Sequence, residues 1–101
     1  MSVMRRDAVL ARLRSLEVRL RRQGVAALLL FGSVARDDSD DESDIDLAFD
    51  LPRDTVFSLF DQAELQIELS EALSASVDFV SLRAMGPEFR RRLQAEMIRV
   101  F

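Results

Sequence analysis

An apolar run at residues 25–31, closed by Gly32, is the feature that most limits how this chain can fold. A strand that is apolar at every position is typical of the middle of a sheet covered on both faces. Gly32 has no Cβ, so the backbone can turn tightly there. Ser33 and the amides after it then lie where they can meet a phosphate. The sequence therefore predicts a central strand that ends in a phosphate-sized turn.

Two carboxylates follow this turn at a spacing typical of a second strand. Asp44 and Asp46 alternate with Ile45, Leu47 and Phe49. Because successive side chains of a strand point to opposite faces, the carboxylates share one face and the large apolar groups share the other. Two aligned carboxylates suit a hard divalent cation.

The remaining pattern predicts an α/β (α+β) fold in which a small mixed sheet carries flanking helices, as a single domain over residues 1–101. The predicted helices cover residues 3–23, a segment from Asp54 or Thr55 to about residue 73, and a last helix opened by residues 86–88. The predicted strands cover residues 25–31, 45–49 and 76–80, and residues 97–101 form a short extension or strand. The apolar face around residues 65–73 is a candidate dimer surface.

The composition of the chain limits which side chains can act as metal ligands or as a general base. The chain has no Cys and no His, so any metal ligand or general base must be Asp or Glu. The net charge is -4, which disfavours direct nucleic-acid binding because a basic face is needed to displace counterions from phosphates. No apolar run approaches the length of a bilayer and the N-terminus lacks a signal-peptide pattern, so we expect a cytoplasmic protein without a membrane partner.

The segment GSVARDDSDDESDIDLAF resembles the signature of the minimal nucleotidyltransferases (MNT) of the DNA polymerase β superfamily: Gly-Ser, about ten residues, then Asp-x-Asp. The resemblance implies the nucleotidyltransferase fold and a third carboxylate on a later strand, which we assign to Asp78. It also implies that Asp44, Asp46 and Asp78 are both the catalytic residues and the ligands of Mg²⁺, two ions in this family. Gly32, Ser33 and Arg36 are the expected nucleotide and phosphate contacts.

The resemblance further implies the antitoxin half of HEPN/MNT toxin–antitoxin pairs. Such an antitoxin transfers AMP from ATP to a tyrosine of its partner, a HEPN-domain ribonuclease toxin, and so neutralises it. One alternative is neutralisation by binding alone, without required catalysis. Another is transfer to a small molecule, which the lack of room for a second domain disfavours.

The loop at residues 37–42 is more acidic than the family pattern, in which Gly commonly follows the Arg that is Arg36 here. Asp37 takes the place of that Gly. The loop lacks the Gly and Glu that a calcium-binding loop needs at its sixth and twelfth positions. Its charge either assists cation recruitment or repels a triphosphate.

Two interpretations are open for Arg36 and two for the arginines at residues 90–92. Arg36 is either a forked phosphate donor or a surface residue paired with Asp37 or Asp38. The three arginines at residues 90–92 are either the exposed side of a helix or a partner-binding patch. In the first case Phe89, Leu93 and Met97, spaced by four residues, face the core.

Overall fold

Four strands form one mixed sheet in the part of the chain that the computed structural model describes, residues 5–37 and 43–101. The strands are β1 (Ala27–Phe31), β2 (Ile45–Asp50), β3 (Val77–Ser81) and β4 (Ile98–Arg99), in the order β3-β2-β1-β4. β1 pairs antiparallel with β2 and β4, and β2 pairs parallel with β3. The predicted mixed sheet with a central first strand is confirmed.

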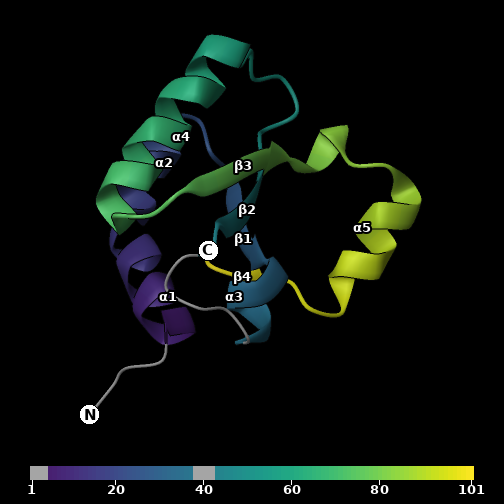
Figure 1. Cartoon of the computed structure of the whole chain (residues 1–101). Helices are drawn as coiled ribbons and strands as arrows, with labels where there is room; N and C mark the ends of the chain where they lie inside the picture. Colours follow the sequence, from purple (N-terminus) through teal and green to yellow (C-terminus); the bar gives the residue numbers. More distant parts are fainter. Residues whose placement is uncertain (1–4, 38–42) are drawn as a thin grey trace.

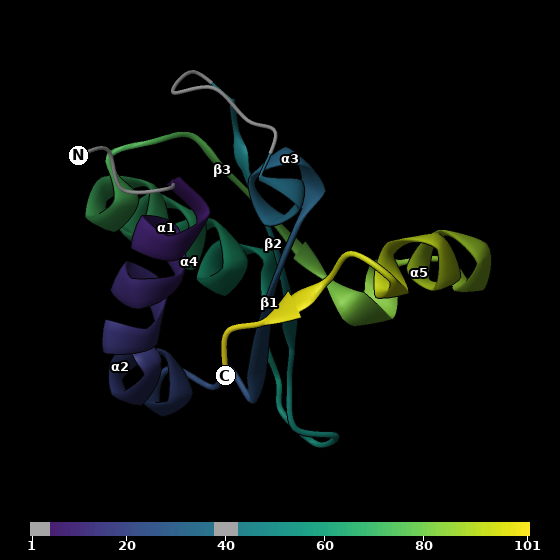
Figure 2. The same cartoon turned by 90° about the horizontal axis from the view of Figure 1, so that it is seen from below.

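Three helices cover one face of this sheet: α1 (Arg5–Ser15), α2 (Glu17–Arg22) and α4 (Leu59–Leu73) (Figures 1 and 2). The main hydrophobic core lies between them and the sheet. It includes buried leucines of the helices and large apolar residues of the strands, among them Leu13, Leu20, Leu65, Leu69, Leu28, Leu30, Leu47, Phe49 and Phe79.

The opposite face of the sheet is only partly covered. The chain leaves β3 through a short 3-10 helix, η1 (Leu82–Ala84), and then forms α5 (Pro87–Gln94), which lies on the far side of the sheet from α1, α2 and α4 (Figure 2). A small second cluster around Phe31, Ala48 and Leu82 fixes this segment to the sheet. No helix within residues 5–37 and 43–101 is long and apolar enough to cross a membrane.

The first predicted helix is broken into α1 and α2. Ser15 Oγ donates a hydrogen bond to the carbonyl oxygen of Arg12 at 2.5 Å. The amide of Leu16 bonds instead to the carbonyl of Leu13, and Leu16 adopts φ -96° and ψ 1°. A serine that bonds back to the preceding turn competes with the helical ladder and bends the helix. No Gly or Pro marks this break in the sequence.

Helix α4 begins later than predicted, because Ser58 and not Asp54 or Thr55 is its N-cap. Ser58 Oγ accepts from the Asp61 amide at 3.1 Å, and the Asp61 carboxylate accepts from the Ser58 amide at 2.9 Å. This reciprocal pair is a capping box. Its Ser-x-x-Asp spacing was present in the sequence and is the signal that the prediction overlooked.

The apolar face of α4 also differs from the prediction. Leu65 and Leu69 are buried in the core, so the predicted dimer surface around residues 65–73 is wrong. Phe60 and Ile67 of the same helix are also apolar, but they are 84% and 59% exposed. The buried and exposed residues lie on opposite sides of the helix, and only packing against the sheet decides which side is covered.

Candidate active site

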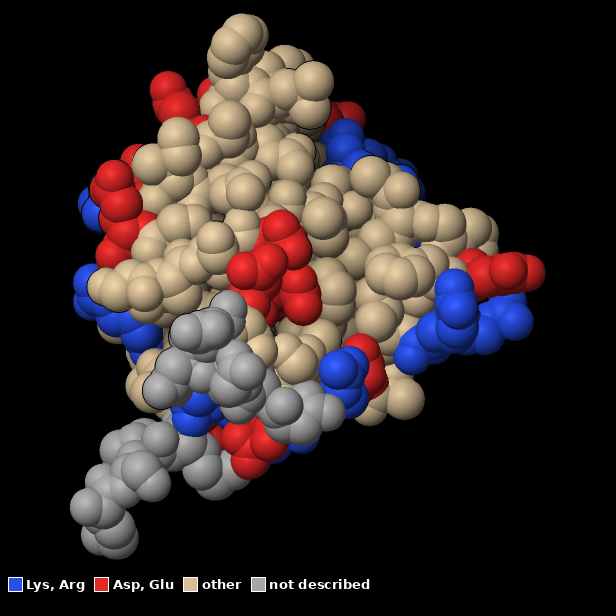
Figure 3. Space-filling model, viewed as in Figure 1, with Lys and Arg blue, Asp and Glu red and all other residues tan. Residues whose placement is uncertain are grey.

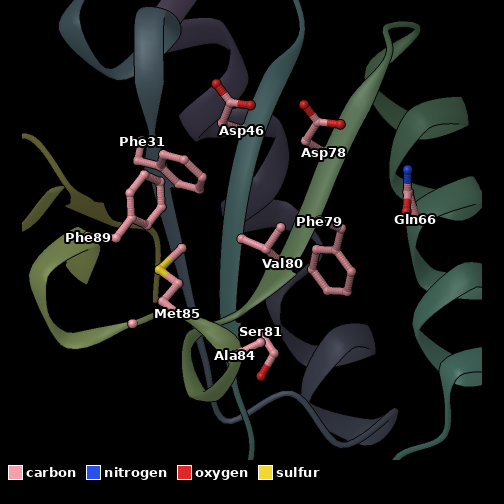
Figure 4. A pocket seen from close by; sticks show the side chains of 11 residues that line it. Phe31, Asp46, Gln66, Asp78, Phe79, Val80, Ser81, Ala84, Met85 and Phe89 are labelled. Carbon is pink, nitrogen blue, oxygen red and sulfur yellow. The ribbon is translucent and has the colours of Figure 1, made fainter.

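Asp46 and Asp78 lie side by side on the partly open face of the sheet. They are partners in the parallel register of β2 and β3, and they share a side-chain hydrogen bond. Figure 4 shows both carboxylates at the same end of their strands. Ile45, Leu47 and Phe49 point the other way and are buried, as the alternation predicted. The sheet therefore brings two of the three predicted carboxylates into contact.

The electrostatics of this pair favour a bound proton or cation. Partial burial, the neighbouring charge of Asp78, the hydrogen bond with Asp78 and the charge of Asp44 raise the pKa of Asp46 from 3.8 to about 6, and Arg36 opposes this shift. Crowded carboxylates resist ionisation because their like charges repel in a poorly solvated place. A cation placed between them would relieve the same repulsion.

Asp44 is exposed and lies just before β2, two residues from Asp46. Its charge reaches Asp46, but residues 5–37 and 43–101 contain no preformed group of three His, Cys, Asp or Glu side chains that could hold a metal ion. The donor set still fits a hard cation, because it consists of carboxylate oxygens and Mg²⁺ completes its coordination with water and substrate phosphates. Asp46 and Asp78 are the two carboxylates that could hold such an ion, and their role as metal ligands stays a prediction.

Gly32 is required by the position of Asp46. It begins α3 (Gly32–Arg36) with φ 77°, a conformation that favours glycine. A Cβ at Gly32 would overlap the Asp46 carboxylate, with Oδ2 as its nearest atom. The missing Cβ therefore leaves room for a carboxylate of the chain itself, and the phosphate contact of Gly32 stays a prediction. Ser33 follows in the first turn of α3 and is half-buried.

Arg36 ends α3 and contacts a residue that neither interpretation named. Its guanidinium lies 3.3 Å from the Glu96 carboxylate, in the segment after α5. Of the two aspartates proposed as its partners, Asp37 is the left-handed C-cap of α3, with φ 63°, and Asp38 lies outside the described residues. The phosphate contact of Arg36 stays a prediction.

Two glutamines that sequence reasoning missed hold the strand of Asp78 in place. Gln62 and Gln66, one turn apart on α4, donate from their side-chain amides to the carbonyl oxygens of Phe79 and Val77, each at 2.9 Å. These carbonyls flank Asp78 on an edge strand, where they would otherwise lack a partner. The i, i+4 spacing of the two glutamines in a helix that follows β2 was the available signal.

A cavity of about 560 Å³ extends from the two carboxylates along the open face (Figure 4). Beyond the carboxylates its wall is mainly apolar and includes Phe31, Val80, Met85 and Phe89. Phe89 was expected to face the core, yet it is 44% exposed and lines this cavity. The site therefore joins a charged end, suited to a metal and phosphates, to an apolar end, suited to a flat ring.

The comparisons with known proteins agree with this geometry. The polymerase β nucleotidyltransferase family matches residues 16–101. A Methanocaldococcus jannaschii protein to which protein adenylyltransferase activity is ascribed is 32% identical over 81 residues, which are 80% of this chain and 85% of that protein.

Solved structures match as well. One described as a minimal nucleotidyltransferase is 32% identical, with a TM-score of 0.79, over 97% of this chain and 98% of that chain. A toxin–antitoxin structure with AMP-PNP includes a chain that is 25% identical, with a TM-score of 0.71, over 87% of this chain and 72% of that one. With its paired carboxylates and its match to the family over residues 16–101, this chain belongs to the polymerase β family of nucleotidyltransferases.

Proposed function

We propose that this chain transfers AMP from ATP, in a Mg²⁺-dependent reaction, to a tyrosine of a HEPN-domain ribonuclease toxin, and that it acts as the antitoxin of that protein. The paired carboxylates of Asp46 and Asp78 are the observation that carries the proposal. The Methanocaldococcus jannaschii relative supports a protein as acceptor. The toxin–antitoxin relative with AMP-PNP supports a toxin partner and a nucleotide substrate.

In this proposal Asp46 and Asp78 hold Mg²⁺, and the exposed side chain of Asp44 joins them. Mg²⁺, when bound, neutralises phosphate charge and helps to align the reacting oxygens. Gly32 keeps the backbone clear of the Asp46 carboxylate, so that this carboxylate can face the ligand. Ser33 and the amides of α3 contact the phosphates. Arg36 joins them by exchanging the Glu96 carboxylate for a phosphate oxygen.

The chemical step is an in-line displacement at the α-phosphorus of ATP. The tyrosine oxygen forms a bond to that phosphorus, and the bond between the α-phosphorus and the bridging oxygen of pyrophosphate breaks. Asp78, which is exposed at the site, accepts the phenolic proton. The products are AMP-tyrosine and pyrophosphate. The apolar end of the cavity offers a surface on which an aromatic ring can lie.

The test is intact-mass spectrometry of the HEPN-domain protein that this proposal expects to be encoded beside this chain, after incubation with ATP and Mg²⁺ and with EDTA as the negative control. We expect a Mg²⁺-dependent gain of one or more AMP masses. Asp44→Asn with Asp46→Asn should abolish the gain and the neutralisation while leaving the complex intact. Asp50→Asn is the matched control, because Asp50 lies on the same strand beside Arg83 and not in the carboxylate cluster.

Neutralisation by binding alone is the second candidate function. It is favoured by the exposed arginines at residues 90–92 of α5 (Pro87–Gln94), which offer a contact surface for a partner outside the carboxylate site. A stable complex without any mass gain, and neutralisation that survives the Asp44→Asn, Asp46→Asn double substitution, would establish this alternative and refute the transferase proposal.

A further inference from the structure

Helix α5 is a basic arm beside the active site. It buries none of its residues, and Figure 1 shows it projecting from the sheet on the side away from α4. Arg90, Arg91 and Arg92 are consecutive on this helix and are all exposed. Figure 3 shows basic side chains on this projection beside an acidic one, away from the acidic residues near the centre of the same view.

The three arginines of α5 form no ion pair with another described residue. Arg19, Arg21, Arg36 and Arg83 form ion pairs with carboxylates, whereas the α5 arginines form none among residues 5–37 and 43–101. The guanidinium of Arg92 lies over the ring of Phe89, at 5.9 Å from its centroid. Within the described residues this positive charge is unpaired, although the chain has 18 acidic residues against 14 arginines. A partner outside the chain is the natural recipient of these donors.

The position of Phe89 indicates that the acceptor protein, and not the nucleotide, contacts the arginines of α5. Phe89 lines the cavity that also contains Asp46 and Asp78, but the three arginines do not line it. Arg91 and Arg92 instead border a shallow depression of about 320 Å³ together with Glu88. A nucleotide held at the carboxylates lies inside the cavity. A protein that inserts a side chain into the cavity must place its own surface against the rim, which α5 forms.

We propose that α5 is a docking surface for the acceptor protein and that it binds an acidic segment next to the acceptor side chain. This inference rests on the proposed function for the identity of the acceptor. Arginine forks match carboxylate pairs in geometry as well as in charge. The chain is acidic as a whole, so an acidic partner is repelled elsewhere and attracted at α5. Such local complementarity fixes the orientation of the complex and speeds its formation.

The test measures binding, so that it does not depend on catalysis. The affinity of this chain for the HEPN-domain protein used in the mass-spectrometry test is measured by isothermal titration calorimetry without ATP, at about 50 mM and about 300 mM NaCl. The test variant is R90E/R91E/R92E. The matched control is R22E/R53E/R99E, which makes the same charge change at three exposed arginines outside α5.

We expect the α5 variant to bind at least about tenfold more weakly at low salt, and the control to stay within about threefold of the wild type. High salt should weaken the wild type and spare the α5 variant. Because glutamates near a helix C-terminus can loosen the helix, R90Q/R91Q/R92Q is measured as well, and it should show a smaller loss in the same direction.

Equal losses in the α5 variant and the control would overturn the docking proposal. It would also be overturned if the α5 variant bound the partner normally but lost affinity for ATP, since the arginines would then belong to the nucleotide site. Weakened binding by the α5 variant, without any AMP transfer by the wild type, would leave docking in place and refute only the transferase function.

Discussion

Replacing Asp46 by Asn should make the protein more stable at neutral pH while it removes activity. The Asp46 carboxylate is partly buried beside Asp78 and near Asp44, which raises its pKa from 3.8 to about 6. The folded chain therefore carries an unfavourable charge at pH 7 that the unfolded chain does not feel. Asn has nearly the same shape, carries no charge and can donate a hydrogen bond to Asp78.

The magnitude follows from the difference between the two pKa values. A shift of about two units corresponds to about 3 kcal/mol at about 1.4 kcal/mol per unit, and partial solvent screening of a half-buried side chain reduces this to about 1–2 kcal/mol. We therefore expect Asp46→Asn to raise the free energy of unfolding by about 1–2 kcal/mol at pH 7.5.

The pH dependence has a definite sign. Between about pH 4 and pH 6 the folded chain keeps a proton on Asp46 that the unfolded chain has released. The stabilisation by this proton is complete below pH 3.8 and is lost as the pH rises through about 6. The wild type should therefore lose stability relative to Asp46→Asn over this window, and the gap between them should nearly vanish at about pH 4.

The assay is urea unfolding followed by circular dichroism, in EDTA, at pH 7.5, 6 and 4.5. Asp50→Asn is the control, since Asp50 lies on the same strand, 4.0 Å from Arg83. We expect no stabilisation by this control at any pH. The reasoning is refuted if Asp46→Asn is no more stable than the wild type at pH 7.5, or if its advantage is the same at pH 4.5.

Three further predictions concern local structure. Gly32→Ala should destabilise the fold by about 1–3 kcal/mol and abolish AMP transfer, because the new Cβ meets the Asp46 carboxylate and the φ of Gly32 is 77°. In urea unfolding, the loss of stability should be smaller when Asp46→Ala is also present. Equal losses with and without Asp46→Ala would exclude the clash. Gln66→Leu should remove the hydrogen bond to the Val77 carbonyl and lower the stability of the fold by about 1 kcal/mol. It should also slow AMP transfer, measured by intact mass. Unchanged transfer would show that α4 does not position Asp78. Ser74→Gly should stabilise the chain by about 0.5 kcal/mol in thermal unfolding, because Ser74 caps α4 with φ 51°, and a lower melting temperature would contradict this.

Local sequence pattern was enough to predict the parts of the site that depend on strand periodicity. The alternation at residues 44–49 places Asp46 and its large apolar neighbours on opposite faces of β2, because a strand has a period of two wherever it lies in the sheet. The apolar run before Gly32 predicted the central strand for a similar reason, since a strand that is apolar throughout is typical of the middle of a sheet.

The tertiary structure decided what depends on contacts between distant segments. The parallel register that sets Asp46 against Asp78 joins residues 32 positions apart, and no local pattern specifies it. Arg36 pairs with Glu96, 60 positions away in the sequence, because the segment after α5 returns to the end of α3.

The same limit explains the errors on the helices. Phe60 and Phe89 have the apolar character of core residues, yet one lies on the outer side of α4 and the other lines the cavity. Apolar spacing tells which residues share a side of a helix, but the sheet decides which side it covers. The sequence by itself thus determined the chemical groups of the site and their faces, and the packing of the sheet determined which of these groups meet.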